Sequence, residues 1–379
     1  MKIDAHYYAV LAFARAIGFN KDSASQVAYA SQFVDDAKIN LIYLKEDPGA
    51  DVKHDVFDGR HLFLNMATCH SYTRVKTFNY DAMINNTSAF HFVPGCEGSK
   101  FPEKLRCKED SEVAKNIINK ALEQPDPIKL GIVLHAYADT FSHQDFSGLL
   151  SKINDIQECK PISDLPLDWR DIAYKIGKFF VKNDMMDKIL DKGLPAYGHG
   201  QAAWLPDLPY LTWAYTYDPS TRFSVMHEGK TKIENPLRFE RAFTKIKSYL
   251  GTFLEKHPQF RDPGIDFQDF DVLFDTLTEK KHTRNRIKSW KDLMVKYRLF
   301  EETELYEKAG AEHDYDENRW LRDAFANFDD KKFDQRTVKD VELAPGFSNS
   351  NWYKYYLAVE WYKDEFFDNC AKLGLDIPR

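Results

Sequence analysis

His135, Asp139 and His143 recur at an interval of four residues in the stretch LGIVLHAYADTFSHQDFSG, and this spacing points to a metal site. An α-helix brings residues four apart to within about 40° of one another, so all three side chains share one face. Two imidazoles and a carboxylate suit zinc or another borderline divalent ion, whereas calcium and magnesium prefer oxygen ligands. The alternative is a core helix whose histidines are satisfied by hydrogen bonds to neighbours. Three ligand residues on one apolar helix favour the metal site.

One helix supplies at most three ligands on one face, so a site for several ions must recruit residues from elsewhere. Candidates occur at the N-terminus, at the end of the second predicted helix, in a long loop region and after the motif: Asp4, His6, Asp35, Asp36, His70, His91, His199 and Asp207. Asp35 and Asp36 could instead be surface acids, and His91 could equally be a buried histidine in an aromatic cluster. His54 and His61 are expected to be loop residues rather than ligands.

The order of these residues resembles that in the zinc-dependent phospholipase C and single-strand-specific nuclease superfamily, as a distant bacterial branch of it. The segment FVDDAK (33–38) is similar to a Trp-Ala-Asp-x-x-Arg segment of the nucleases, with lysine in place of arginine. MATCHSY (66–72) resembles an apolar context followed by His-Tyr, and LHAYADTFSHQ (134–144) resembles the central Leu-His-x3-Asp-x-x-Ser-His motif. The resemblance is local and spans residues 1–210. It implies an all-helical fold with a three-metal cluster.

The resemblance also implies a role for each matching residue. Asp35 would bind a metal and accept a proton, with Asp36 as a supporting or alternative ligand, and Lys38 would hold a phosphate oxygen. Asp139 would bridge two ions. The implied metal ligands are His6, Asp35, His70, His135, Asp139, His143, His199 and Asp207, and His91 is a further candidate. The spacing of His199 and Asp207 departs from the His-x3-Asp of the nucleases.

The N-terminus departs from the superfamily in a second way. Processed members bind one metal through a terminal tryptophan and a nearby histidine, whereas this sequence starts at Met1. His6 can keep the role of the histidine, and Asp4 could replace the terminal amine. Without such a replacement, the cluster would hold two ions rather than three.

The implied activity is hydrolysis of a phosphoester, either a phospholipid headgroup or a phosphodiester, with Asp35, Asp139 and Lys38 as the catalytic residues. The cofactor would be two or three Zn²⁺ ions or other divalent transition metals, because closely placed ions make hydroxide available near neutral pH. One alternative is a non-catalytic, metal-stabilised effector or interaction protein whose charged C-terminal part binds a protein partner. Another is a metallohydrolase with a substrate that lacks phosphate.

The elements that must position these residues are mainly helices. Apolar residues at three-to-four spacing predict a first helix at 4–19, which Gly18 would end, and a second at 23–39, which Asp22 or Ser23 would cap. The same spacing predicts further helices at 111–124, 169–193, 235–257, 286–300 and 352–374. Strand-like alternation is scarce, and residues 46–102 read as a long irregular segment. We expect a mainly α protein, a helical bundle with a multi-metal cleft and long loops. A core at 1–258 would carry a helical C-terminal extension at 259–379, which either stands apart or packs on the core as one domain.

Composition argues against several classes of protein. The chain has 379 residues and a formal net charge of −7, which disfavours a broad surface for duplex nucleic acid. No apolar run reaches the roughly 18–20 residues that a membrane span needs. Five widely spaced cysteines favour free thiols over a disulfide framework. The N-terminus does not read as a signal peptide, so we expect a cytoplasmic protein or one exported by a route that needs no signal peptide.

Overall fold

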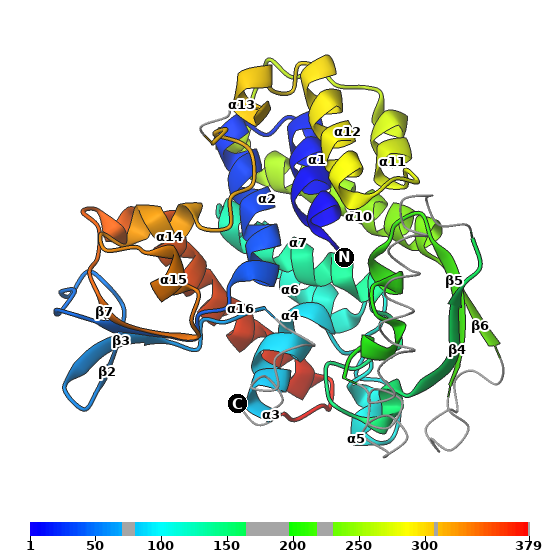
Figure 1. The fold of residues 1–379 in the computed structure, drawn as a ribbon, viewed down its shortest axis with the longest axis horizontal. Coiled ribbons are helices and arrows are strands. Elements are labelled where there is room, and N and C mark those ends of the chain that lie inside the picture. Colours follow the sequence, from blue (N-terminus) through cyan, green and yellow to red (C-terminus); the bar gives the residue numbers. More distant parts are fainter. Residues whose placement is uncertain (70–79, 164–196, 218–229, 307–309, 378–379) are drawn as a thin grey trace.

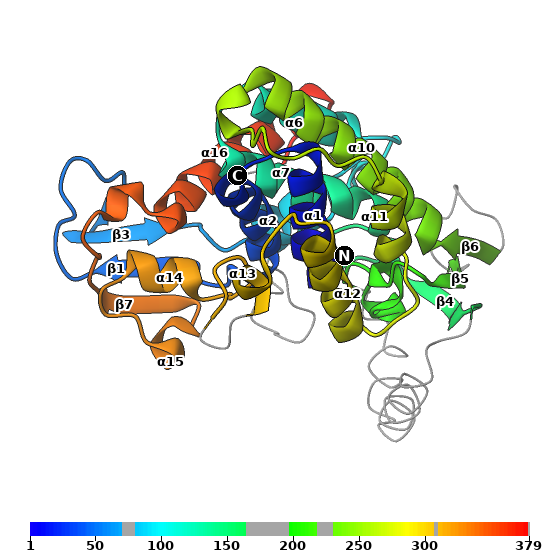
Figure 2. The same ribbon diagram turned by 90° about the horizontal axis from the view of Figure 1, so that it is seen from above.

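Helices form the centre of the protein, and two small β-sheets lie at opposite ends of its long axis (Figures 1 and 2). The structure is a computed structural model that describes residues 1–69, 80–163, 197–217, 230–306 and 310–377. The mainly helical class expected from the sequence is confirmed for these residues. None of the helices described is both long enough and apolar enough to cross a membrane.

Two helical segments open the chain and carry the first candidate ligands. The π-helix η1 (Asp4–Ala9) continues into α1 (Val10–Ile17), which ends at Gly18 with φ of 109°, as predicted. Helix α2 (Lys21–Asp36) begins two residues before the predicted start. Its cap is Asn20, whose side chain accepts the Ser23 N–H, so the prediction of Asp22 or Ser23 as cap is wrong.

Helix α7 (Pro127–Ser142) is the central element, and it contains most of the predicted metal motif. Asp126 caps its N-terminus by accepting the N–H groups of Ile128 and Lys129. His143 is the C-cap residue, so it extends from the end of the helix rather than from its interior. Around α7 pack α2 and three further helices: α6 (Glu112–Leu122), α10 (Asn235–Lys256) and α16 (Asn351–Lys372).

Gly131 lies where α7 meets α2. A Cβ atom at this position would stand 2.3 Å from the carbonyl oxygen of Val27 and 2.8 Å from the Cβ atom of Ala30. The absence of a side chain therefore allows the two helices to approach closely. This approach brings Asp35, near the end of α2, to within 3.8 Å of His135 on α7.

The substitution Gly131→Ala is expected to lower the free energy of unfolding by about 1–3 kcal/mol, because the added methyl group forces α2 and α7 apart. Urea unfolding measures the change. Gly251→Ala in α10 is the matched control, since a Cβ atom there meets nothing within 4 Å. We expect this control to be neutral or stabilising by up to about 1 kcal/mol. Similar destabilisation by both substitutions would contradict the tight contact at Gly131.

The two sheets were not predicted, since strands were expected to be scarce. The first sheet has the order β2-β3-β1-β7 and the second the order β4-β5-β6. Their strands are β1 (Leu41–Leu44), β2 (Asp55–Phe57), β3 (Arg60–Leu64), β4 (Ile156–Pro161), β5 (Thr212–Tyr217), β6 (Lys230–Glu234) and β7 (Thr337–Val341). The segment 46–102 is thus only partly irregular, because β2 and β3 form an antiparallel pair within it.

The predicted helices at 111–124, 235–257, 286–300 and 352–374 are confirmed as α6, α10, α12 (Thr283–Lys296) and α16. The predicted helix at 169–193 lies outside the described residues. The remaining helices are short: α3 (Tyr80–Ala82), η3 (Met83–Ser88), α4 (Ala89–His91), α5 (Phe101–Lys104), η4 (Lys152–Asn154), η5 (Gly200–Ala202), η6 (Leu205–Asp207), η7 (Pro258–Phe260), α11 (Phe270–Leu277), α13 (Glu302–Tyr306), α14 (Arg319–Ala324), α15 (Asp330–Phe333) and η8 (Phe347–Asn349).

Residues from both predicted parts of the chain share one hydrophobic core. The ring of Phe13 in α1 contacts Phe243 in α10, and it also contacts Phe274 in α11 and Trp290 in α12. Helix α16, near the C-terminus, packs on α6 and α7. The segments after residue 258 therefore lie against the helices that carry the candidate ligands.

Candidate metal centre

Eight of the predicted ligands meet in the middle of the molecule, close to the N-terminus (Figure 1). They come from η1, α2, α4, α7 with its C-cap, and the segment of η5 and η6. Among the described residues they form the groups His6–Asp35–His135, His91–His135–Asp139 and His143–His199–Asp207. In each group one ligand atom per residue lies within 4.8 Å of the others. These buried groups of histidine and aspartate are suited to hold metal ions.

The group around His135 has the spacing of a coordination shell. His135 Nε2 lies 3.2 Å from His91 Nδ1 and 3.4 Å from Asp139 Oδ2, and His91 Nδ1 lies 3.3 Å from the same oxygen. Asp35 Oδ1 completes the set at 3.7 Å from His91 and 3.8 Å from His135. Ligand atoms around a tetrahedral zinc ion, with bonds of about 2.0–2.1 Å, lie about 3.3 Å apart. The atoms from His91, His135 and Asp139 therefore have the spacing of zinc ligands, and Asp35 Oδ1 lies slightly farther away.

Asp139 faces two groups at once through its two carboxylate oxygens. Oδ2 belongs to the group of His91 and His135, whereas Oδ1 lies 3.2 Å from His6 Nε2 and 2.6 Å from the amino nitrogen of Met1. That nitrogen is also 3.4 Å from Asp207 Oδ1. Burial lowers the pKa of this amino group, but the surrounding carboxylates outweigh burial and raise the pKa to about 10. The two oxygens of Asp139 therefore have different neighbours, His91 and His135 on one side and His6 with the Met1 amino group on the other.

Hydrogen bonds on the outer side of three histidines fix which nitrogen faces the cluster. His91 donates from Nε2 to the Thr68 carbonyl at 3.0 Å, and His143 and His199 donate from Nδ1 to the carbonyls of His91 at 2.7 Å and of Ala203 at 2.9 Å. A carbonyl oxygen only accepts, so each neutral ring keeps a lone pair on its inner nitrogen. Such outer hydrogen bonds are typical of histidines that bind metals.

The inner nitrogens of His143 and His91 face carboxylate oxygens. His143 Nε2 lies 3.2 Å from Asp207 Oδ1, and His91 Nδ1 lies 3.3 Å from Asp139 Oδ2. Burial lowers the pKa of His91, and it lowers the pKa of His199 to about 4, so both rings are neutral near pH 7. Two acceptors without a proton between them repel each other, and a cation between them removes the repulsion. The donor set therefore fits metal ions.

Asp35 is the candidate ligand most accessible to solvent. Its side chain is 26% exposed, whereas those of Asp139, His91 and His135 are at most 1% exposed. Loss of water contact raises the pKa of Asp35 to about 7, and nearby His91 opposes this shift while Asp139 adds to it. A carboxylate with a raised pKa near an opening is suited to take up a proton.

Other predicted site residues lie elsewhere. Asp4 is buried but forms an ion pair with Arg286, with 2.7 Å between Asp4 Oδ2 and Arg286 Nε. Asp36 points away from Asp35, because neighbours on a helix are about 100° apart, and it accepts hydrogen bonds from Tyr315 and Gln32. His70 lies outside the described residues.

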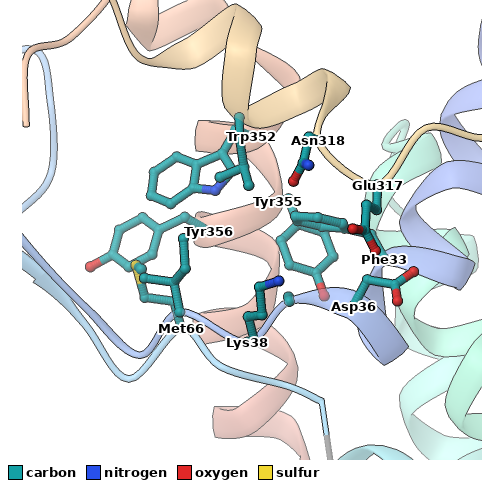
Figure 3. Close-up of a pocket in the computed structure, with 12 residues that line it drawn as sticks. Phe33, Asp36, Lys38, Met66, Glu317, Asn318, Trp352, Tyr355 and Tyr356 are labelled. Atoms are coloured by element: carbon teal, nitrogen blue, oxygen red, sulfur yellow. The ribbon is translucent and has the colours of Figure 1, made fainter. Parts of the chain in front are cut away.

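Lys38 lines an aromatic pocket rather than the metal groups (Figure 3). Its ammonium group pairs with Asp334, and Trp352 and Tyr355 form other parts of the wall. The pocket has a volume of about 20 Å³, enough for about one water molecule. In this structure the Lys38 ammonium group faces the Asp334 carboxylate.

Sequence reasoning missed the residues that surround the cluster from the C-terminal part of the chain. Arg286 fixes η1 from α12, and Thr283, Tyr315, Asp316 and Glu317 line a groove beside Asp35. No local pattern marks them, because they lie about 280 residues from the N-terminal ligands in sequence.

The chain belongs to a family of unknown function (DUF6765), whose model matches residues 1–370. No curated protein and no solved structure matches the chain. These comparisons assign no larger superfamily, so the resemblance to phospholipases C and single-strand-specific nucleases rests on the motifs alone.

Proposed function

We propose that this member of the DUF6765 family is a metal-dependent hydrolase of phosphoesters, with two or three zinc-like ions at the buried cluster. The observation that carries the proposal is Asp139, whose Oδ2 faces His91 and His135 while its Oδ1 faces His6. Bound divalent ions at such spacing would lower the pKa of water toward about 7 and neutralise charge on a phosphoryl group. The ligands would be His6, Asp35, His91, His135, Asp139, His143, His199 and Asp207.

The side chains of the cluster would have different roles according to their exposure to solvent. Asp139, His91 and His135 are buried and hydrogen-bonded, so they hold their positions and exclude water. Asp35 stands at the opening, where it can orient a water molecule and accept its proton. The group of His143, His199 and Asp207 offers three ligands, and three ligands with an open position are typical of catalytic rather than structural zinc.

A groove of about 690 Å³ leads to this opening. Its lining includes Met1, Lys2, Ile3, Gln32, Asp35, Asp36, Thr283, Tyr315, Asp316 and Glu317. The acids Asp35, Asp36, Asp316 and Glu317 outnumber the two cationic groups of the lining, Lys2 and the amino group of Met1, so the walls carry net negative charge. Such walls repel a polyanion and favour a substrate whose remaining part is neutral or cationic. We therefore infer that the substrate is a small phosphoester or a headgroup rather than a polynucleotide.

The test compares metal content and hydrolysis in the full chain. Chelator-treated protein should be inactive on bis(4-nitrophenyl) phosphate, and added zinc should restore activity. Asp35→Asn should lower kcat by about 100-fold or more, since a positioned proton acceptor contributes roughly 10²–10⁴-fold. Asp22→Asn, an exposed acid on the same helix, should leave kcat unchanged. Asp36→Asn should keep the metal and change only KM.

Three outcomes would contradict or redirect the proposal. The absence of bound transition metal from the purified protein would contradict the proposal. Retained metal without hydrolysis of any phosphoester, including cationic, neutral and polynucleotide substrates, would favour the non-catalytic, metal-stabilised interaction protein. Faster hydrolysis of polynucleotides than of small cationic esters would contradict the inference from the acidic groove.

A further inference from the structure

A second group of metal-binding side chains lies on the four-stranded sheet, at the end of the molecule away from the buried cluster (Figure 1). Asp47 is in the loop after β1, His54 directly precedes β2, and His61 lies in β3. His54 Nε2 is 2.7 Å from His61 Nδ1, which is 3.7 Å from Asp47 Oδ1. Each of the three residues offers a ligand atom within 4.8 Å of the others.

The two imidazoles are held in place by their surroundings. His54 donates from Nδ1 to the Val52 carbonyl at 2.7 Å, so Nε2 of the neutral ring carries the lone pair that faces His61. The Lys53 N–H donates to the hydroxyl of Tyr353 in α16 at 2.6 Å, which anchors the loop. His61 is fixed by strand pairing opposite Val56. Ligands oriented by outer hydrogen bonds bind metals more tightly than mobile ones.

We propose that Asp47, His54 and His61 form a separate site for one borderline divalent ion, such as Cu²⁺, Ni²⁺ or Zn²⁺. Two imidazole nitrogens and a carboxylate oxygen suit these ions. In the metal-free protein His61 donates a proton to His54, which accounts for the distance of 2.7 Å. Binding replaces this proton by the metal, and the proton leaves to solvent.

The position of the group supports access by an ion from solution. Both imidazoles are half-buried, and Asp47 is 65% exposed, so the ion would keep open positions for water. The other surface group with this geometry, Asp22–Glu312–His313, has only one imidazole, and its Nδ1 is already engaged by Ser25. The pair of imidazoles therefore distinguishes the group at Asp47. This inference does not depend on the proposed hydrolase activity.

Copper titration of chelator-treated full-length protein tests the site. The native protein should bind one more Cu²⁺ than the double variant His54→Gln/His61→Gln, and its electron paramagnetic resonance spectrum should show coupling to two imidazole nitrogens. Asp139→Asn should retain this ion and its spectrum while losing ions from the buried cluster. Asp47→Asn should weaken binding by at least about tenfold, because loss of a residue that only orients a metal ligand already costs about 10–100-fold. Asp51→Asn, an exposed acid of the same loop, should change nothing.

Equal copper stoichiometry and spectra for the native protein and the double variant would overturn the proposal. Unchanged affinity in Asp47→Asn would remove Asp47 from the site. Because Asp47 is on the surface, that variant tests the site even if the double variant folds poorly. Binding of an ion at Asp47, His54 and His61 in a protein without phosphoesterase activity would leave this proposal intact, so the two proposals fail independently.

Discussion

Asp139→Asn should release metal from the buried cluster and lower phosphoester hydrolysis by more than about 100-fold. Residues that only orient metal ligands contribute about 10–100-fold to affinity or activity, and Asp139 would contact two ions directly. Asparagine keeps the shape of the side chain but removes the charge. It also turns an NH₂ group toward either His6 or the pair of His91 and His135, which face the two carboxylate oxygens. In either orientation, asparagine therefore loses the metal-binding oxygen on one side of residue 139.

Elemental analysis after dialysis, together with kinetics on bis(4-nitrophenyl) phosphate, measures this effect. Asp126→Ala is the control on the same helix, because it removes the N-cap of α7 without touching the cluster. It should lower the free energy of unfolding by about 1 kcal/mol and leave metal content unchanged. Native metal content in Asp139→Asn would refute the bridging role, and metal loss in Asp126→Ala would show that stability rather than ligation controls binding.

The helices could be predicted because their information is local. The central helix is marked by an apolar run after Asp126 and Pro127, and Gly18 ends the first helix where its positive φ is needed. The spacing of His135 and Asp139 likewise follows from one turn of helix. The sheets are different, because β1 pairs with β7, in parallel, across about 300 residues of sequence. Short strands with distant partners leave no periodic signal in the chain.

The same difference between local and distant information applies to the candidate metal ligands. Histidine and aspartate types identified the candidates, but type alone did not separate Asp35 from Asp36 or mark His91 above other loop histidines. Helix α4 packs on α7 and brings His91 to 3.2 Å from His135, which depends on tertiary packing rather than on local pattern. Lys38 takes the place of the arginine in the nuclease motif. Helix α2 ends at Asp36, and the side chain of Lys38 pairs with Asp334.

Arg286→Met should lower the free energy of unfolding by about 3–5 kcal/mol, the cost of leaving a buried charge without its partner. Arg286 is fully buried, and its Nε lies 2.7 Å from Asp4 Oδ2, while the Asp4 side chain is 3% exposed. Its guanidinium also lies over the ring of Tyr210, 5.3 Å from the centroid. Because Asp4 lies two residues before His6 in η1 and Tyr210 lies three residues after Asp207, Arg286 links two segments that carry candidate ligands. Metal affinity should fall together with stability.

Urea unfolding of the variants distinguishes the ion pair from general packing. The double variant Asp4→Asn/Arg286→Met should recover most of the lost stability, because neither charge then remains buried alone. Arg284→Met, an exposed residue on the same helix, should change stability by less than about 0.5 kcal/mol. If the double variant is as unstable as Arg286→Met, packing of the long side chain rather than charge holds η1. If metal affinity is unchanged in Arg286→Met, His6 keeps its position without α12, and the segment after residue 258 does not position the cluster.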